Sequence, residues 1–265
     1  WSSHRFGLTA DRWNFLKGKS IWITGAGTGY GRSMAIGFAA ARAQVILTGR
    51  RREKLEETVA EMQKLGIDTG SCVILPADLS QPKQIHHAGE VVKKKCSALY
   101  GLIHNAAVPC RTFYHPLQEE KLDHWDHMFR VNVTAPWLLT REIFSHMASG
   151  RHVRILFITS EAAWAFACGF GPYNVTKAAL NNLMGSLTEE FTATYPQMDI
   201  QINALSPGEA KTEMNPYSTW SPFSVVSMTM ILLSHPSGGP NGKFFHRDGR
   251  HLEFGYASPY PHPLI

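Results

Sequence analysis

The sequence predicts an α/β fold: a parallel seven-stranded sheet, doubly wound, with helices on both faces in three layers. Two observations predict it. Short apolar runs alternate with longer helical patterns along the chain, and the first run passes directly into a cluster of glycines. Strands that alternate with helices pair in parallel through right-handed crossovers. The chain has 265 residues, which suits one domain over residues 1–265 with a core from about 16 to 250.

Seven apolar runs are the expected strands. Runs of this length, rich in β-branched and aromatic residues and bounded by turn residues, are typical of strands in a buried sheet. They are SIWITG (20–25), QVILTG (44–49), the run within SCVILPADLS (71–80), YGLIHNAA (100–107), RILFITS (154–160), DIQINALSPG (199–208) and GKFFHRDG (242–249).

Helical periodicity occurs between these runs. The expected helices are GRSMAIGFAAARA (31–43), EKLEETVAEMQKLG (53–66), two stretches between Glu119 and Phe144, the segment from PYNVTK to about Tyr195, and SPFSVVSMTMILLS (221–234). The two ends, including YASPYPHPLI (256–265), are expected to be irregular. The alternation of strand and helix therefore extends along most of the chain.

Composition excludes several classes of protein. Apolar residues make up 44% and charged residues 18%, which indicates a globular chain. The net charge of +5 is mild, and the basic runs at 50–52 and 93–95 are short, so we expect no nucleic-acid partner. No apolar stretch reaches about 18 residues, so no membrane span is expected. The amino end lacks the order of a signal peptide.

The four cysteines, Cys72, Cys96, Cys110 and Cys168, are widely spaced and form no C-x-x-C pair. In a chain too large to need disulfides, this spacing predicts reduced thiols and a reducing compartment. We therefore expect a cytoplasmic protein. Because the first residue is Trp1, an upstream segment that carries a targeting signal stays open.

The first expected strand leads into TGAGTGYG (24–31), which is followed by the first helix. Glycines at Gly25, Gly27, Gly29 and Gly31 permit a tight turn and let the backbone approach a pyrophosphate at the amino end of that helix. Glycines alone are weak evidence, but their place between strand and helix predicts dinucleotide binding.

The second expected strand ends at Gly49 and is followed by Arg50 and Arg51. Sites that prefer NAD place a carboxylate near this strand end for the ribose 2′-hydroxyl. A guanidinium instead suits a 2′-phosphate through charge-assisted bonds. We therefore expect NADP(H) to be favoured over NAD(H). The alternative is that the arginines only solvate the start of the next helix.

Tyr173 and Lys177 lie four residues apart in PYNVTK. On a helix, two such side chains share one face, so the ammonium can lie near the phenol. A positive charge there favours the phenolate, whose ordinary pKa is about 10, and makes acid-base chemistry possible. Taken alone, the pair favours the simpler interpretation, an ordinary solvated helix face.

Taken together, these segments resemble the short-chain dehydrogenase/reductase family, from about Leu16 to Gly249. The family's motifs occur in its order: TGAGTGYG, then Asp78-Leu79, Asn105-Ala106-Ala107, Asn132 within RVNV, Ser160, Tyr173-x-x-x-Lys177, and Pro207-Gly208 with Thr212. The resemblance implies a Rossmann-type fold and hydride transfer between a nicotinamide and a carbonyl or secondary alcohol substrate.

The resemblance also implies roles for the matching residues. Tyr173 would be the general acid or base, Lys177 would lower its pKa, Ser160 would hold the substrate oxygen, and Asn132 would interrupt its helix and position a water. The cofactor-binding set would be Gly25, Thr28, Gly29, Tyr30, Gly31, Arg50, Arg51, Asp78, Leu79, Asn105, Ala106, Tyr173, Lys177, Pro207, Gly208 and Thr212. The substrate pocket would come from residues 160–172 and 207–224.

The chain departs from the family pattern at several positions. Ala107 replaces a glycine, Tyr30 stands where isoleucine is common, and Thr176 replaces a serine. None of these changes removes a catalytic group. The loop after Thr212 is short, which favours either an open pocket for a bulky substrate or a small pocket closed by a neighbouring subunit.

Other polar and aromatic residues have open interpretations. The histidines at 86, 87, 124 and 127 are expected to face solvent, because no cysteine or carboxylate completes a metal-ligand set. Trp164, Phe166 and Phe170 fit either an apolar wall for substrate or the core. Glu161 and Glu209 would favour a cationic or polyhydroxylated substrate if they face the pocket; an outward orientation is slightly preferred.

The sequence leaves two alternatives to an NADP-preferring reductase. One is an epimerase or dehydratase of the sugar-nucleotide type; such relatives usually have a longer carboxy-terminal substrate domain, which is not expected in these 265 residues. The other is a non-catalytic NADP-sensing protein, although such proteins typically lose the tyrosine, lysine or serine. The resemblance also implies a homodimer or homotetramer formed through the helix that carries Lys177 and the helix before it.

Overall fold

The computed structural model describes residues 4–109, 116–165 and 168–253. Its centre is one sheet with the strand order β3-β2-β1-β4-β5-β6-β7-β8. The strands are β1 (Ser20–Thr24), β2 (Gln44–Gly49), β3 (Val73–Pro76), β4 (Gly101–His104), β5 (His152–Ile158), β6 (Asp199–Ser206), β7 (Lys243–His246) and β8 (His251–Leu252). The chain order reverses beside β1, as in a doubly wound fold.

The predicted parallel sheet is confirmed, with one correction. The seven predicted strands pair in parallel as β1 to β7, but the described residues contain an eighth strand. This strand, β8, pairs antiparallel with β7 through Phe244↔Leu252 and Phe245↔His251. Its two residues follow a turn that contains Gly249, and a run of two residues has no periodicity from which a strand can be predicted.

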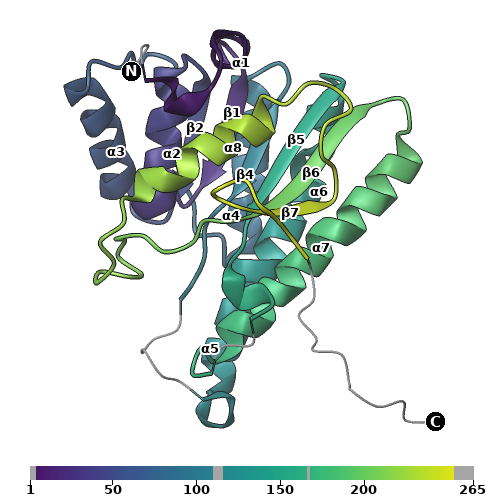
Figure 1. The fold of residues 1–265 in the computed structure, drawn as a ribbon. Coiled ribbons are helices and arrows are strands. Elements are labelled where there is room, and N and C mark those ends of the chain that lie inside the picture. The colour runs from purple at the N-terminus through teal and green to yellow at the C-terminus, as the bar shows by residue number, and fades with distance from the viewer. Residues whose placement is uncertain (1–3, 110–115, 166–167, 254–265) are drawn as a thin grey trace.

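Helices cover both faces of the sheet (Figure 1). Packed around one core are α2 (Gly29–Ala40), α3 (Arg52–Lys64) and α8 (Val226–Leu233); around the other are α4 (Pro82–Lys95), α6 (Ala135–Ala148) and α7 (Pro172–Thr194). Neighbouring residues of β1 alternate between the cores, because Ile21 and Ile23 pack in the first and Trp22 in the second. The sheet is thus buried on both faces.

The amino end is not irregular as predicted. A 3-10 turn (Arg5–Gly7) is followed by α1 (Ala10–Phe15), whose start is capped by the Thr9 side chain. Trp13 of this helix is buried in the first core. The predicted irregular segment 256–265 lies outside the described residues.

The two helical stretches predicted between Glu119 and Phe144 are α5 (Leu122–Phe129) and α6. A π-helical turn, Arg130–Thr134, joins them. Short 3-10 turns occur at Leu117–Glu119, Glu161–Ala163 and Pro222–Val225.

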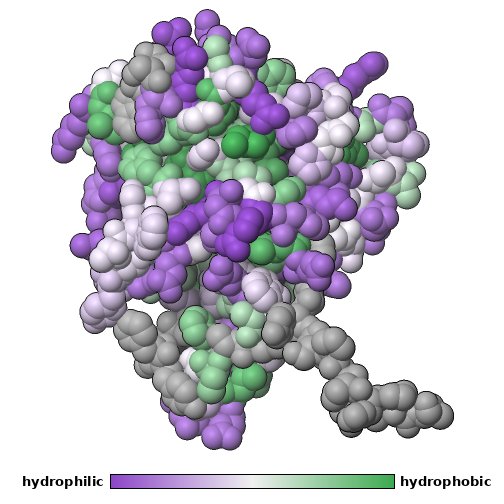
Figure 2. Space-filling view, in the orientation of Figure 1, coloured by the Kyte–Doolittle hydropathy of each residue, from purple (hydrophilic) through white to green (hydrophobic). Residues whose placement is uncertain are grey.

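In Figure 2, hydrophobic side chains gather at the end of the molecule where α5 lies, whereas polar side chains cover the middle of this face. No helix among the described residues has the length and hydrophobicity needed to span a membrane.

Candidate active site

One cavity of about 410 Å³ opens at the carboxyl ends of the parallel strands. This volume is within the range of small-molecule and cofactor sites, and the strand ends beside the switch in strand order are where such sites form. Its lining combines the glycine turn, the start of α3, the loops after β3, β4 and β6, and the first turns of α7. The predicted site residues among them are Gly25, Thr28, Gly29, Tyr30, Arg50, Arg51, Asp78, Leu79, Asn105, Ala106, Tyr173, Lys177, Pro207 and Thr212.

The glycine turn packs too closely for side chains. Gly25 has φ +67°, and a Cβ atom built on Gly31 would lie 2.1 Å from the carbonyl oxygen of Gly25. Gly31 does not line the cavity but lets the first turn of α2 pack against the turn. The backbone therefore approaches the cavity directly, at the amino end of a helix, where its partial positive charge favours a phosphate.

Thr24 and Asn105 hold the glycine turn against the loop after β4. The Thr24 hydroxyl accepts hydrogen bonds from the backbone of Asn105 (2.9 Å) and Ala106 (3.1 Å) and donates to the carbonyl of Ile103 (3.2 Å). The Asn105 amide donates to the Thr24 carbonyl (2.9 Å) and to that of Gly25 (3.3 Å). Two neighbouring strand ends are thereby locked together at the cavity.

Lys177 and Tyr173 lie on one face of α7, as their spacing predicts. The Lys177 Nζ lies 5.5 Å from the centre of the Tyr173 ring and donates to the carbonyl of Ile158 at the end of β5 (2.9 Å). Only 3% of Lys177 is exposed, and this burial lowers its pKa from 10.5 to about 8. A cation of limited hydration therefore lies beside the phenol, at the inner end of the cavity.

Asn132 lies in the π-helical turn, so the helical path is interrupted where the resemblance implies. Its side chain does not line the cavity. The Asn132 amide oxygen accepts from the Val108 backbone (2.7 Å), and its amide nitrogen donates to the Val108 carbonyl (3.1 Å) and to the Thr176 hydroxyl (3.1 Å). Asn132 thus joins the loop after β4 to α7, one residue before Lys177.

Ser160 and Gly208 flank the cavity without lining it. Ser160 follows β5, and its hydroxyl accepts from the backbone of Ala162 (3.1 Å) at the start of a 3-10 turn. Gly208 has φ +62°, and its carbonyl accepts a hydrogen bond from the Tyr30 hydroxyl (2.7 Å). Burial raises the pKa of Tyr30 well above its usual range, so this phenol stays protonated as a donor.

The opposite end of the cavity carries several charges. Arg50, Arg51 and Lys54 line it at the end of β2 and the start of α3, and Asp78 lines it after β3. The side chain of Asp78 accepts from the backbone of Ser80 (2.9 Å). Gly49 occupies the strand end, as the sequence shows, so no carboxylate stands at that position.

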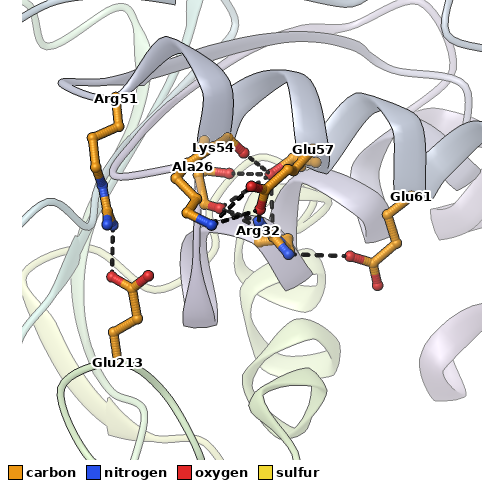
Figure 3. A network of polar contacts seen from close by, with 9 residues as sticks. Ala26, Arg32, Arg51, Lys54, Glu57, Glu61 and Glu213 are labelled. Atoms are coloured by element: carbon orange, nitrogen blue, oxygen red, sulfur yellow. Dashed lines mark hydrogen bonds and ion pairs between the residues drawn. The ribbon is translucent and has the colours of Figure 1, made fainter.

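Figure 3 shows the ion pairs of Arg51, Lys54 and the nearby Arg32. Lys54 binds Glu57 through both carboxylate oxygens (2.8 and 2.9 Å), and Arg32 donates to the Gly27 carbonyl (2.7 Å) and binds Glu57 (3.0 Å). Arg32 thereby ties the glycine turn to α3, and Lys54 holds the Glu57 carboxylate in place. These contacts were not predicted, because Arg32 and Lys54 lie within ordinary amphipathic helical patterns.

The candidate substrate side is less enclosed. Phe170 is 42% exposed, with its ring 6.5 Å from that of Tyr173, whereas Trp164 packs against the second core. Phe166 lies outside the described residues. Glu161 faces outward with 54% of its side chain exposed, 3.6 Å from the His246 ring nitrogen, and Glu209 is also exposed. The preferred outward orientation of the two glutamates agrees with these positions.

Two of the four histidines that were expected to face solvent, His86 and His124, lie beside carboxylates. The ring of His86 lies 2.8 Å from Glu142, and the buried ring of His124 lies 2.9 Å from Glu120. His124 is therefore buried rather than solvated as predicted, since it faces inward from α5. Among the described residues, no three histidines, cysteines or carboxylates are grouped so that they could hold a metal ion. Cys72 and Cys96 are free thiols, Cys168 is exposed, and Cys110 lies outside the described residues.

Two groups of residues line the cavity without having been named individually as site residues. Val108 and Pro109 extend the loop after Ala107, whereas Glu213 and Met214 fall within the predicted substrate-pocket range 207–224. Glu213 forms an ion pair with Arg51 (2.6 Å). The proximity of Glu213 to the predicted Thr212 was the available signal, but its partner lies 162 residues away in the chain.

The fold and this cavity agree with the comparison to known proteins. The family model of short chain dehydrogenases matches residues 19–220, and the chain belongs to that family. It is therefore an oxidoreductase that acts on a CH–OH/C=O pair.

Several relatives resemble the chain over nearly its whole length. The 5-keto-D-gluconate 5-reductase of Escherichia coli (strain K12) is 27% identical over 252 residues, which cover 88% of this chain and 95% of the relative. The gluconate 5-dehydrogenase of Gluconobacter oxydans is 27% identical over 255 residues, covering 88% and 94%. A metagenomic short-chain oxidoreductase solved in complex with NADP is 26% identical, with a TM-score of 0.74 over 86% of this chain and 96% of that one.

Proposed function

We propose that this protein transfers a hydride between NADPH and a carbonyl or secondary alcohol substrate, with Tyr173 as the acid or base. The observation that carries the proposal is the placement of Lys177: a buried ammonium 5.5 Å from the Tyr173 ring, at the inner end of a cavity that begins at a glycine turn. In such a site, the protein supplies orientation and a proton, while the cofactor supplies the hydride.

The glycine turn fits a dinucleotide, because a Cβ on Gly31 would collide with the backbone of Gly25 and the bare backbone of Gly25, Gly27 and Gly29 lines the cavity. Backbone groups at the start of α2 would bind the pyrophosphate. Asn105 and Ala106 would lie along the ribose, Asp78 and Leu79 beside the adenine, and Pro207 and Thr212 near the carboxamide.

Each catalytic group has a distinct proposed task. Tyr173 protonates the substrate oxygen during carbonyl reduction and accepts that proton in the reverse direction. The positive charge of Lys177 favours the phenolate form and so assists the proton transfer. Ser160 holds the substrate oxygen beside the phenol, and Asn132 positions a water that connects Lys177 to solvent.

NADPH is preferred because the end of β2 carries Arg50 and Arg51 where an NAD site has a carboxylate. A guanidinium binds a phosphate through charge-assisted hydrogen bonds. The relative solved with NADP supports this preference. Side-by-side thermal titration with NADPH and NADH tests it, since a ligand that binds only the folded state raises its apparent stability.

The substrate is a small carbonyl or alcohol compound. The first pair to assay is 5-keto-D-gluconate and gluconate, because two relatives of the same length act on compounds with these names.

Tyr173→Phe tests the catalytic proposal. It removes only the hydroxyl, so we expect turnover to fall at least a hundredfold while NADPH still binds, because general acid-base catalysis contributes roughly 10²–10⁴. Tyr195→Phe, at the end of the same helix, is the matched control and should retain activity. The assay follows the absorbance of the reduced nicotinamide over many turnovers.

Each alternative function predicts a different result in that assay. An epimerase or dehydratase would convert substrate with no net change in the reduced nicotinamide. A non-catalytic sensor would bind NADPH without turnover, and the wild-type chain and Tyr173→Phe would then behave alike with every substrate. Either result would contradict the proposal.

We also propose a homodimer or homotetramer formed through α6 and α7. Trp137 on α6 and Val175 on α7 are large hydrophobic side chains that remain partly exposed. A cytoplasmic location is part of the proposal. Light scattering of the purified chain measures its mass in solution, and a monomeric mass would contradict the assembly.

A further inference from the structure

An ion pair spans the cavity between two distant segments of the chain. The Arg51 guanidinium, at the cap of α3, lies 2.6 Å from the Glu213 carboxylate, and both side chains line the cavity (Figure 3). Their side chains are 50% and 55% exposed, so the pair lies at the mouth rather than in the protein interior. Its geometry is that of a charge-assisted hydrogen bond.

The segment that carries Glu213 lies directly over the glycine turn. A Cβ atom built on Gly29 would lie 2.9 Å from the Thr212 methyl group, so Thr212 touches the turn itself. The backbone of Thr212 and that of Asn215 exchange hydrogen bonds (3.1 and 3.2 Å), which hold the intervening Glu213 in a tight turn. The carboxylate is therefore placed beside the cations of α3 by local structure.

The two arginines at the end of β2 differ in their partners. Arg50 lines the cavity and forms no ion pair with any residue that the structure describes, whereas Arg51 is already bound to a carboxylate. A carboxylate and a phosphate use the same guanidinium N–H donors. Glu213 occupies one terminal nitrogen of Arg51, so an anion that takes this donor, as a bidentate phosphate would, must displace Glu213.

We propose that Glu213 competes with the 2′-phosphate of NADPH for Arg51 and is a specificity-determining residue that reduces the preference for NADPH over NADH. This inference rests on the proposed function. NADPH breaks the Arg51–Glu213 pair when it binds, whereas NADH has no 2′-phosphate and leaves the pair intact. The competition therefore weakens NADPH binding selectively.

The size of the effect follows from the exposure of the pair. Exposed ion pairs contribute little, and the loss of one changes a dissociation constant by about two- to fivefold. Glu213→Gln removes the charge and keeps the size and hydrogen-bonding capacity of the side chain. We expect it to tighten NADPH binding by about two- to fivefold at low salt and to change NADH binding less.

The experiment measures the dissociation constants of NADPH and NADH by cofactor fluorescence, for the wild-type chain and for Glu213→Gln. Glu53→Gln is the matched control, because Glu53 is an exposed carboxylate near Arg51 that forms no ion pair with it. Displacement of the bound cofactor by adenosine 2′,5′-bisphosphate and by adenosine 5′-monophosphate isolates the phosphate end of the site. The bisphosphate alone should gain affinity in Glu213→Gln.

Three results would overturn the inference while leaving the proposed function intact. The first is that Glu213→Gln leaves the ratio of the NADPH and NADH dissociation constants unchanged. The second is that Glu53→Gln changes this ratio by the same amount. The third is that Glu213→Gln still changes the ratio when Arg51 is already replaced by alanine. The first result would mean that Arg50 binds the phosphate while Arg51 remains on Glu213. Failure of the wild-type chain to bind either dinucleotide would instead overturn the proposed function together with this inference.

Discussion

Lys177 is an ammonium that folding removes from water. Burial lowers its pKa from 10.5 to about 8, so the folded state binds this proton less tightly than the unfolded state. Below pH 8 both states carry the charge, and the folded state bears the cost of burying it. As the pH rises from about 8 to 10.5, the folded lysine loses its proton first, and its contribution to the free energy of unfolding becomes more favourable.

Lys177→Met should therefore increase the stability of the folded chain and abolish its activity. At neutral pH we expect the variant to be more stable by about 2 kcal/mol, because the buried charge is removed and only one hydrogen bond, to Ile158, is lost. The gain should shrink as the pH rises from about 8 to 10.5, and hydride transfer should be lost. Urea denaturation at several pH values measures the difference.

Lys64→Met, on the exposed end of α3, is the control for the loss of a lysine. It should change neither the stability at neutral pH nor its dependence on pH by more than a few tenths of a kcal/mol. A Lys177→Met variant whose stability relative to the wild-type chain is the same at every pH would show that burial does not perturb this lysine.

At the scale of elements, the glycine turn depends on the close packing of α2 against β1. Gly31 sits in the first turn of α2 and faces the carbonyl of Gly25, whereas Gly185 lies within α7 with no atom near the position of a Cβ. The same substitution to alanine should therefore have opposite effects in the two helices.

Gly31→Ala should destabilise the chain by about 2 kcal/mol or more and remove dinucleotide binding, because the new methyl group displaces the turn. Gly185→Ala should stabilise it by about 0.5–1 kcal/mol, since alanine restricts the unfolded chain and favours the helix. Thermal unfolding with and without NADPH measures both effects. Equal stability of the two variants would contradict this account of the turn.

The sequence predicted most strands and helices, but it did not predict irregular turns such as the π-helical turn between α5 and α6. Strand periodicity placed β1 and β2 to within a residue, because these runs are bounded by charged or glycine-rich segments. The interruption at Asn132 was expected only from the family resemblance. No local pattern marks a π-helical turn; the hydrogen bonds of Asn132 to Val108 stabilise it from outside its own helix.

At the scale of the whole molecule, an ion pair joins the amino ends of the central strands β5 and β6, at the end of the sheet opposite the cavity. Arg154 on β5 is almost fully buried and donates to the Asp199 carboxylate at the start of β6 (2.6 Å). Burial acts to raise the pKa of Asp199, but hydrogen bonds from Arg154 and His152 lower it to about 2. Folding therefore favours the ionised carboxylate.

Asp199→Ala should destabilise the protein by about 3–5 kcal/mol at neutral pH, because Arg154 would remain buried without its carboxylate. In the wild-type chain, the stabilisation is present above the ordinary pKa of 3.8 and is lost as the pH falls towards 2. The variant should lose less stability over that window. Chemical denaturation between pH 5 and pH 2 tests this, and parallel curves for the two proteins would contradict it.

The sequence alone predicted the dinucleotide site and the acid-base pair, because the residues of each group are close together in the chain. The glycines of residues 24–31 lie in one turn, and Tyr173 and Lys177 are one helical turn apart, so backbone geometry alone brings each group together. The alternation of strands and helices likewise predicted the doubly wound sheet, because parallel pairing requires a crossover between successive strands.

The folded chain was needed to find contacts between separate strand ends. Arg51 follows β2 and Glu213 follows β6, and neither their spacing nor their local sequence pairs them. The same holds for the bond from Tyr30 to the Gly208 carbonyl and for the approach of Asn132 to Val108. Such contacts depend on the order of strands in the sheet and on the course of each loop, which are set by packing of the whole chain rather than by local periodicity.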